Sequence, residues 1–549
     1  MTKKILALIL AVFMLVPMLA SCGNEETSGK KDRDDREERE ENENDDETGK
    51  GGNFLDGLFG ADDEPAQSGQ LENVPTQSEN AEGEQNPSAV PVDPELKEID
   101  DYVDELAAEY NFGGKTFTFV GGGSQAPSDD YETGDTVNDA LYYRQRDIEE
   151  KFDVEFCNYV PESVDGEEVH PVVDSVRIDV MAGTHAYNAG YGTPVAVCQP
   201  LLQVGALTAV NDFEGIDLSR RWWTSTLYDT YTIGGDVYFL NGAIVTSNYT
   251  DANAVLFNRQ IAEEYGISEF YSHVKDGTWT FDKMFELAGY VPTNEYGTGI
   301  YRYATPDGIA VLYANGYSVT KFDSDGMPCV PESLPRELDD FSTRFSAIFG
   351  DDTQTAHTKI YMSSSTAENF EDKYGYDDAY EMFASSKILF YFTTTGEAAD
   401  LREEDVDFGI LPLPKGSVSQ DDYVSYAEPW ETFNVFVPKS GVDTEMTGVI
   451  LEAMAALGLR YIKGAYYDNL LQGRSTYDSD SREMLDIIYE TKVYDLVSVI
   501  EESDGSSMYS AVLRGAIQET NQGIATKYAL QARIHNTRIK SLLKTLENK

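Results

Sequence analysis

KTFTFV, residues 115–120, is a run of aromatic and β-branched residues of the kind that forms a strand. Apolar residues then recur at helical spacing over 136–152, and VEFCNY at 154–159 has the pattern of a second strand. A strand, a loop, a helix and a strand in this order predict an α/β fold. Similar patterns predict helices at 258–265, 281–288 (with Thr280 as N-cap), 444–457, 481–489 and within 508–546, and strands at 407–413 and 433–438.

The N-terminus has the pattern of an export signal. Lys3 and Lys4 precede an apolar run over 5–20, which is too short to span a membrane comfortably, and Leu-Ala-Ser-Cys follows at 19–22. This arrangement resembles the lipobox of bacterial lipoproteins, in which the new N-terminal cysteine is acylated. The resemblance implies a signal peptide at 1–21, a lipid on Cys22, and anchoring at the extracellular face of the cell membrane of a Gram-positive-type bacterium. The alternative is an ordinary signal peptide with an incidental cysteine.

Residues 22–95 have the composition of a disordered acidic linker. The run at 30–50, KKDRDDREEREENENDDETGK, is almost entirely charged, and Pro, Ser, Gln, Asn and Glu follow it in low-complexity order. Such a segment cannot bury enough apolar surface to offset the entropy of ordering. The formal net charge of -57 for the whole chain also argues against nucleic acid and anionic headgroups as partners.

The remaining residues, 96–549, are too many for one core and predict two lobes. After Cys22 only Cys157, Cys198 and Cys329 remain, and the first two lie in short apolar stretches. We therefore expect buried free thiols, although one pair could be oxidised.

Two short motifs resemble ligand sites but do not predict one. Gly121, Gly123 and Ala126 follow a strand, but no helix start comes next, so we do not expect a bound dinucleotide. Asp-Ser-Asp-Gly at 323–326 resembles the start of a calcium loop that no glutamate closes, and it predicts a hairpin turn. The five histidines show no paired metal spacing, so we expect neither a metal nor a cofactor.

A set of segments in a fixed order gives a stronger signal. Together they resemble the extracellular solute-binding proteins of ABC importers, in the carbohydrate-type family with the maltose-binding fold. The likeness covers about 115–496, and its segments are IDLSRRWW (216–223), YTIGGDVYF (231–239), VLFNR (255–259), VKDGTWT (274–280), FGILPLPK (408–415) and FVPK (436–439).

The resemblance implies a two-lobed periplasmic-binding-protein-like fold of type II, with strands that cross between the lobes and a ligand held between them. It puts the first crossing near 250–257 and the second near 411–415. Lobe one is then about 112–252 plus 415–465, and lobe two about 253–414 plus 466–549. The implied partners are a carbohydrate ligand and the permease subunits of an importer, and we expect a monomer.

The same resemblance suggests the ligand contacts. Aromatic rings can cover the faces of sugar rings, and carboxylates and hydroxyls can take the sugar hydroxyls in hydrogen bonds. The chain lacks the asparagine-glycine-proline-tryptophan type of turn that better-known members have near Thr393, which weakens the inference of a maltodextrin ligand. The candidate contacts are Tyr191, Thr193, Trp223, Asp251, Thr393, Thr394, Trp430 and Tyr467.

Each candidate also has a structural interpretation, since Trp223 favours packing and Asp251 or the threonines could simply form turns. We expect no enzymatic activity. Two other classes stay open: a cell-surface carbohydrate-active hydrolase, for which no local motif marks a pair of carboxylates, and a surface carbohydrate sensor or adhesin without a transport role.

Overall fold

The computed structural model describes residues 94–547 apart from 129–130, 163–169, 295–297, 305, 325, 358–369, 428, 472–478, 501–507, 509–511 and 513–523. The expected signal peptide, Cys22 and most of the expected linker lie outside the described residues. The helices are α2 (Pro94–Glu109), α3 (Thr136–Phe152), α4 (Pro171–Ala182), α5 (Gln199–Gln203), α6 (Ser225–Tyr231), α7 (Ser247–Thr250), α8 (Arg259–Glu264), α9 (Phe270–Lys275), α10 (Phe281–Ala288), α11 (Gly308–Ala314), α12 (Arg336–Phe349), α14 (Phe370–Tyr374), α15 (Ala379–Ala384), α16 (Thr395–Asp400), α17 (Thr444–Leu471), α18 (Ser479–Glu490), α19 (Val497–Ile500) and α20 (Ile524–Glu547).

The first sheet has the strand order β12-β3-β1-β2. The strands are β1 (Lys115–Val120), β2 (Val154–Tyr159), β3 (Ala189–Gly192) and β12 (Asn434–Phe436), and only β12 runs antiparallel to its neighbour. β1, α3 and β2 confirm the predicted strand–helix–strand start. β3 needs small residues because a Cβ on Gly190 would lie 2.4 Å from the Phe436 ring.

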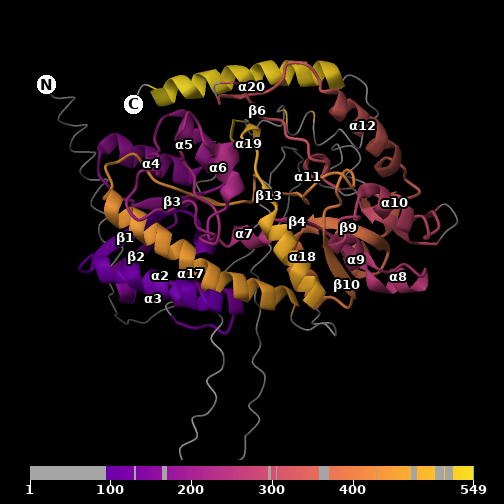
Figure 1. The fold of residues 1–549 in the computed structure, drawn as a ribbon, viewed down its shortest axis with the longest axis horizontal. Coiled ribbons are helices and arrows are strands. Elements are labelled where there is room, and N and C mark those ends of the chain that lie inside the picture. Colours follow the sequence, from indigo (N-terminus) through magenta and orange to yellow (C-terminus); the bar gives the residue numbers. More distant parts are fainter. Residues whose placement is uncertain are drawn as a thin grey trace, which may run out of the picture. The chain divides into compact units, whose positions relative to one another are not determined.

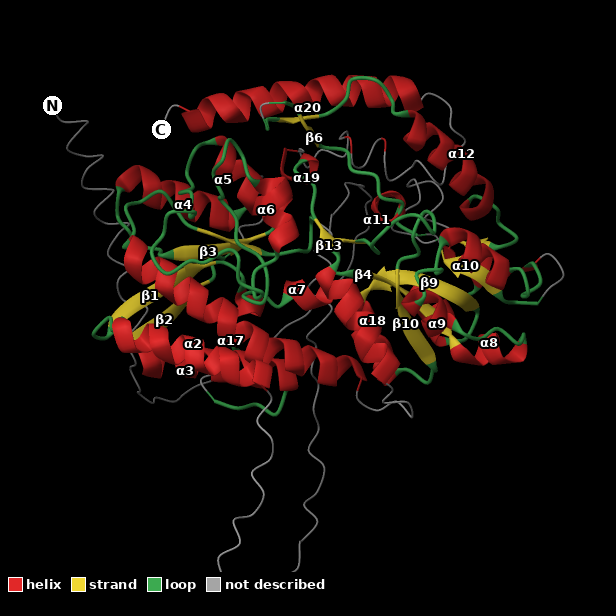
Figure 2. Cartoon of the chain, in the orientation of Figure 1, coloured by secondary structure: helices red, strands yellow, loops and turns green. Residues whose placement is uncertain are grey.

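The second sheet has the order β10-β4-β9-β5-β8. The strands are β4 (Asn253–Asn258), β5 (Tyr301–Ala304), β8 (Thr355–Ala356), β9 (Ile388–Thr394) and β10 (Phe408–Pro412). β4 lies antiparallel between β9 and β10, whereas β5 runs parallel to β9 and β8. Figure 2 shows both sheets in yellow with helices in red around them.

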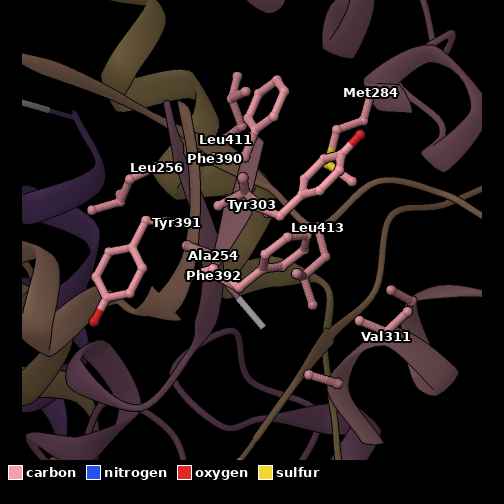
Figure 3. Packing of buried hydrophobic residues seen from close by; sticks show 14 of the residues in the cluster. Ala254, Leu256, Met284, Tyr303, Val311, Phe390, Tyr391, Phe392, Leu411 and Leu413 are labelled. Carbon is pink, nitrogen blue, oxygen red and sulfur yellow. The ribbon is translucent and has the colours of Figure 1, made fainter. Parts of the chain in front are cut away.

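The two sheets have separate hydrophobic cores. Leu256 on β4, Phe390 and Phe392 on β9 and Leu411 on β10 pack with Met284 of α10 in the core of the second sheet (Figure 3). Other clusters of buried residues surround the first sheet, one with Phe117 of β1 and another with Phe436 of β12. The predicted two-lobed α/β fold is therefore confirmed, and we call the bodies around the first and second sheets the first and second lobes.

The chain returns to the first lobe later than the predicted crossing at 411–415. Leu413 and Tyr426 still belong to the core of the second lobe, and Val435 is in the core of the first. The intervening segment stays with the second lobe because the Lys415 backbone N–H donates to Trp279 O at 3.1 Å and Lys415 O accepts from the Phe281 N–H at 3.0 Å.

The predicted boundary between residues 465 and 466 lies within α17, but the assignment of all of 466–549 to the second lobe needs correction. α17 joins both lobes, since Ile462 is in the core of the first lobe and Tyr467 in that of the second. The C-terminal region is shared as well, because Leu496 and Leu542 pack against residues of the first sheet whereas Tyr528 packs in the second lobe. Figure 1 shows α20 in yellow, reaching from the side of α12 to that of α5.

Several local predictions are confirmed. The Thr280 side chain accepts a hydrogen bond from the Lys283 N–H at the start of α10. The Asp323 turn joins the hairpin strands β6 (Lys321–Phe322) and β7 (Pro328–Cys329). Cys157, Cys198 and Cys329 form no disulfide among the described residues; the expected burial is confirmed for Cys198, whereas Cys157 is only half-buried. Within the described ranges, no helix has both the length and the apolar character needed to cross a membrane.

Candidate functional site

Three segments lie side by side where the chain passes between the lobes. Ala252 forms an antiparallel bridge with Ala427. β11 (Ser425–Tyr426) pairs in parallel with β13 (Lys492–Val493), and the Ala427 N–H donates to Val493 O at 3.0 Å. These short strands form the junction of the two lobes, and each brings polar side chains to it.

A buried ion pair lies at this junction. Asp251 is 1% exposed, and its Oδ1 is 3.9 Å from Lys492 Nζ, whose side chain is completely buried. The ammonium group donates to Asn248 O at 2.7 Å and also to the Asn248 side chain. Among the described residues, no group in hydrogen-bonding geometry donates to either oxygen of Asp251, and the buried hydroxyl of Thr432 also has no hydrogen-bond partner.

Burial dominates the electrostatics of this pair. It raises the pKa of Asp251, although Lys492 and the nearby Thr432 hydroxyl oppose that rise. It lowers the pKa of Lys492 to about 8, against the attraction of Asp251. Buried polar groups in proteins nearly always have partners, so these oxygens are able to accept a hydrogen bond from a bound group. We call Asn248, Tyr249, Asp251, Thr432 and Lys492 the junction cluster.

Tyrosines from several helices surround the junction cluster. The Tyr249 ring of α7 stacks on Tyr466 of α17 at 5.7 Å between centroids and meets the edge of Tyr489 of α18 at 5.3 Å. Tyr489 also contacts Tyr467, whose hydroxyl donates to Asp486 Oδ1 at 2.6 Å. The Tyr249 hydroxyl is buried and lacks a hydrogen-bond partner among the described groups. The predicted residue Tyr467 therefore lies at the edge of the cluster, in ring contact with Tyr489.

The end of β9 places two predicted threonines beside the junction. Thr393 and Thr394 pair with Ala254 and Asn253 of β4, three and two residues after Asp251. Their hydroxyls are already used, because Thr393 donates to the Glu397 carboxylate and Thr394 accepts from the Glu397 N–H. Burial raises the pKa of Glu397 to about 7, although a hydrogen bond from Tyr391 opposes this. These threonines mainly fix the start of α16.

Two further predicted contacts, Tyr191 and Thr193, lie at the end of β3 in the first lobe. Tyr191 is 2% exposed and stacks on Phe119 at 4.6 Å, and burial raises its pKa to about 12. Beside it, Arg144 is buried and donates to Ile244 O at 2.7 Å and Gln125 O at 3.2 Å. A cavity of about 10 Å³, room for about one water, lies among these side chains. Thr193 follows β3 and has a largely buried side chain.

The tryptophans differ sharply in their surroundings. Trp223, a predicted ligand contact, is 4% exposed and donates from Nε1 to Glu452 Oε2 at 2.8 Å. Its ring is therefore part of the core of the first lobe. Trp279 is fully buried and donates to Pro412 O at 2.9 Å. Trp430 is 39% exposed and lies two residues before Thr432 of the junction cluster. Of these rings, Trp430 alone is available to stack on a ligand.

Sequence reasoning missed Lys492, Thr432 and Tyr249. A lysine inside the short apolar stretch Lys492-Val493-Tyr494 is a weak sign of a buried charge, but nothing local identifies Asp251 as its partner 241 positions earlier. The structure thus brings Asp251, Thr393 and Thr394 to one junction, leaves Trp430 exposed two residues before Thr432 in the sequence, and buries Trp223 in a core.

Comparison with known proteins finds solved structures that are similar to this chain. A cyclo/maltodextrin-binding protein complexed with maltotetraose is 11% identical, with 80% of this chain and 98% of that chain covered and a TM-score of 0.48. An ABC transporter solute-binding protein from Thermotoga lettingae TMO bound with α-D-tagatose is 13% identical, with 78% and 100% covered and a TM-score of 0.44. UgpB from Mycobacterium tuberculosis, in complex with glycerophosphocholine, is 13% identical, with 79% and 99% covered and a TM-score of 0.46.

No protein-family model matches the sequence, and no curated protein matches it. With identities of 11 to 13% and TM-scores of 0.44 to 0.48, the solved structures establish neither a family membership nor a ligand for this chain.

Proposed function

We propose that this chain is the membrane-anchored, extracellular binding component of an ABC importer, which captures a sugar or oligosaccharide between its two lobes. The observation that carries the proposal is the junction cluster, in which the Asp251 carboxylate is buried and receives no hydrogen bond of good geometry from the described residues, with the Thr432 hydroxyl nearby and Lys492 Nζ at 3.9 Å. A ligand hydroxyl can donate that hydrogen bond, and a carboxylate takes sugar hydroxyls well.

The surroundings of the cluster support the same class of ligand. A site for a small molecule combines apolar and aromatic surface with a few polar groups that fix orientation. Tyr249, Tyr466 and Tyr489 supply the aromatic surface, and Trp430, two residues before Thr432, has an exposed ring. Because the chain crosses between the lobes here, a ligand bound at this point contacts both lobes and can stabilise their closure.

The proposed reaction is binding without chemical change. Anchoring through Cys22 keeps the protein at the membrane, and delivery to permease subunits follows from the importer role. The hydrolase alternative makes a different prediction, since it requires turnover of a bound glycoside by two carboxylates. Recovery of the bound sugar unchanged, by mass spectrometry after prolonged incubation, separates the two.

The test is calorimetric titration of a panel of mono- and oligosaccharides, followed by variants with any sugar that binds. We expect Asp251→Asn and Trp430→Ala each to weaken binding about tenfold or more, because each removes a direct contact. Tyr290→Ala is the matched control, since Tyr290 is a 61% exposed aromatic residue away from the junction cluster. Unchanged affinity in both site variants would place the sugar elsewhere.

A further inference from the structure

The C-terminal helix α20 presents one continuous buried stripe. Its buried residues recur every three or four positions along 24 residues, as in a helix that lies flat on a surface. They are Ile524, Tyr528, Gln531, Ala532, His535, Ile539, Leu542 and Leu546. The surface that the stripe covers belongs to both lobes.

The N-terminal half of α20 is held by the second lobe. Tyr528 and Ala532 belong to the core cluster of the second sheet and are completely buried. Asn536 pairs with both backbone groups of Val330, accepting from its N–H at 2.9 Å and donating to its carbonyl at 2.8 Å. Arg533 lies 3.6 Å from Glu332, at the surface. This half is therefore fixed by directional bonds as well as by packing.

The C-terminal half of α20 lies on the first lobe. Ile539, Leu542 and Leu546 belong to a cluster that includes residues of β1 and β12 as well as Leu201 and Leu202 of α5. These three aliphatic side chains make non-directional contacts that fix no single geometry, whereas the two Asn536–Val330 hydrogen bonds hold the other half in one position. Figure 1 shows α20 reaching α5 at this end.

We propose that α20 is a strap that restrains the two lobes, and that its C-terminal half leaves the first lobe when the lobes move apart. A helix packed on both bodies resists any change in the distance between its two contact surfaces. The junction strands set where the lobes pivot, and the strap limits how far they open. The inference depends on the two lobes and not on the identity of the ligand.

The test compares paired variants of the full chain in the ligand-free state. Leu542→Asp/Leu546→Asp places charge under the C-terminal half. Leu530→Asp is the matched control, because Leu530 lies on the same helix and is 58% exposed. We expect a larger radius of gyration in X-ray scattering for the double variant only. We also expect faster hydrogen exchange over 539–546, with protection at 528–532 retained.

Milder substitutions cover the case in which buried aspartates prevent folding. Leu542→Ala/Leu546→Ala should give the same changes with smaller amplitude, and Leu530→Ala should give none. A radius of gyration equal to that of the unmodified protein in a folded double variant would overturn the proposal. Equal loss of protection in both halves of α20 would overturn it too, because the helix would then detach as a unit.

Discussion

Glu452 of α17 organises one face of the first lobe. Its Oε1 accepts from Trp222 Nε1 at 3.0 Å and from the Tyr102 hydroxyl at 3.1 Å. Its Oε2 accepts from Trp223 Nε1 at 2.8 Å and from the Asp217 N–H at 3.1 Å. Four donors on one buried carboxylate explain why two adjacent tryptophans pack inward in a segment that resembles a ligand-binding family.

This carboxylate makes the stability of the protein depend on pH. Burial raises the pKa of Glu452 to about 7, against its four donors, and the unfolded value is near 4.5. Folding raises the pKa of Glu452, so folding is favoured when this group is protonated. The stability gained in this way is complete below pH 4.5, about the unfolded pKa, and is lost as the pH rises through about 7. At about 1.4 kcal/mol per pKa unit, the full effect is about 3 kcal/mol.

We therefore expect the stability gap between the unmodified protein and Glu452→Gln to widen as the pH falls from 7.5 to 5. Urea unfolding at a series of pH values measures this gap. Glu263→Gln, at an exposed position, is the control and should give a small gap at every pH. A gap for Glu452→Gln that is the same at pH 7.5 and pH 5 would contradict the assigned pKa.

The buried pair of Asp251 and Lys492 should behave as a coupled unit. Removing one partner leaves an uncompensated buried charge, which typically costs about 3 to 5 kcal/mol, whereas removing both often costs much less. We expect Asp251→Asn and Lys492→Met each to lower the free energy of unfolding by a few kcal/mol, and the double variant to lose less than their sum. A double-mutant cycle in urea measures the coupling. Additive losses would mean that the two charges do not interact across their 3.9 Å separation.

At the scale of elements, two of the three glycines of α17 have opposite surroundings. A Cβ on Gly458 would lie 1.9 Å from Ala243 O, so this glycine lets α17 approach the backbone of the first lobe. Gly464 has nothing within 4 Å of such a Cβ, and it lies between Ile462 of the first core and Tyr467 of the second. Packing therefore requires glycine at position 458 but not at position 464.

This contrast gives a paired prediction. Gly464→Ala should raise the free energy of unfolding by about 0.5 to 1 kcal/mol, because alanine favours the helix. Gly458→Ala should lower it by more than that, because the backbones must separate to admit the methyl group. Chemical unfolding of both variants measures the two signs. A stabilised Gly458→Ala variant would contradict the close approach at Ala243.

The elements that the sequence predicted well are those with a strong local signal. The strand at 115–120, the helix at 136–152 and the Thr280 cap depend on periodicity and on one side-chain hydrogen bond, so nearby residues determine them. The crossing at 411–415 was misplaced because contacts from Lys415 to Trp279 hold that segment, and no local pattern reports a partner so distant in sequence.

The candidate site was harder to predict for the same physical reason. Asp251 was identified, but its orphaned state follows from burial by the segments around Ala427 and Lys492. Trp223 and Trp430 are chemically the same, and only their exposures of 4% and 39% distinguish a core ring from an available one. Burial depends on the whole fold, so residue type alone could not separate them.

At the scale of the whole molecule, α2 is the first segment of the chain that the folded part needs for its stability. Ile99 and Val103 are buried in the first lobe, and Tyr102 donates to Glu452. Burying an aliphatic side chain contributes roughly 1.5 to 3 kcal/mol, so α2 contributes several kcal/mol in all. The charged segment before it has no composition suited to burial, and we expect it to contribute nothing comparable.

Two truncations test this boundary. A chain that begins at residue 94 should melt at the same temperature as one that begins at residue 23, because it keeps α2 complete. A chain that begins at residue 111 loses Ile99, Tyr102 and Val103, so it should melt many degrees lower and free the Glu452 carboxylate of one donor. Differential scanning calorimetry compares the three chains. A lower melting temperature for the chain that begins at residue 94 would show that residues 23–93 pack on the folded part and are more than a tether.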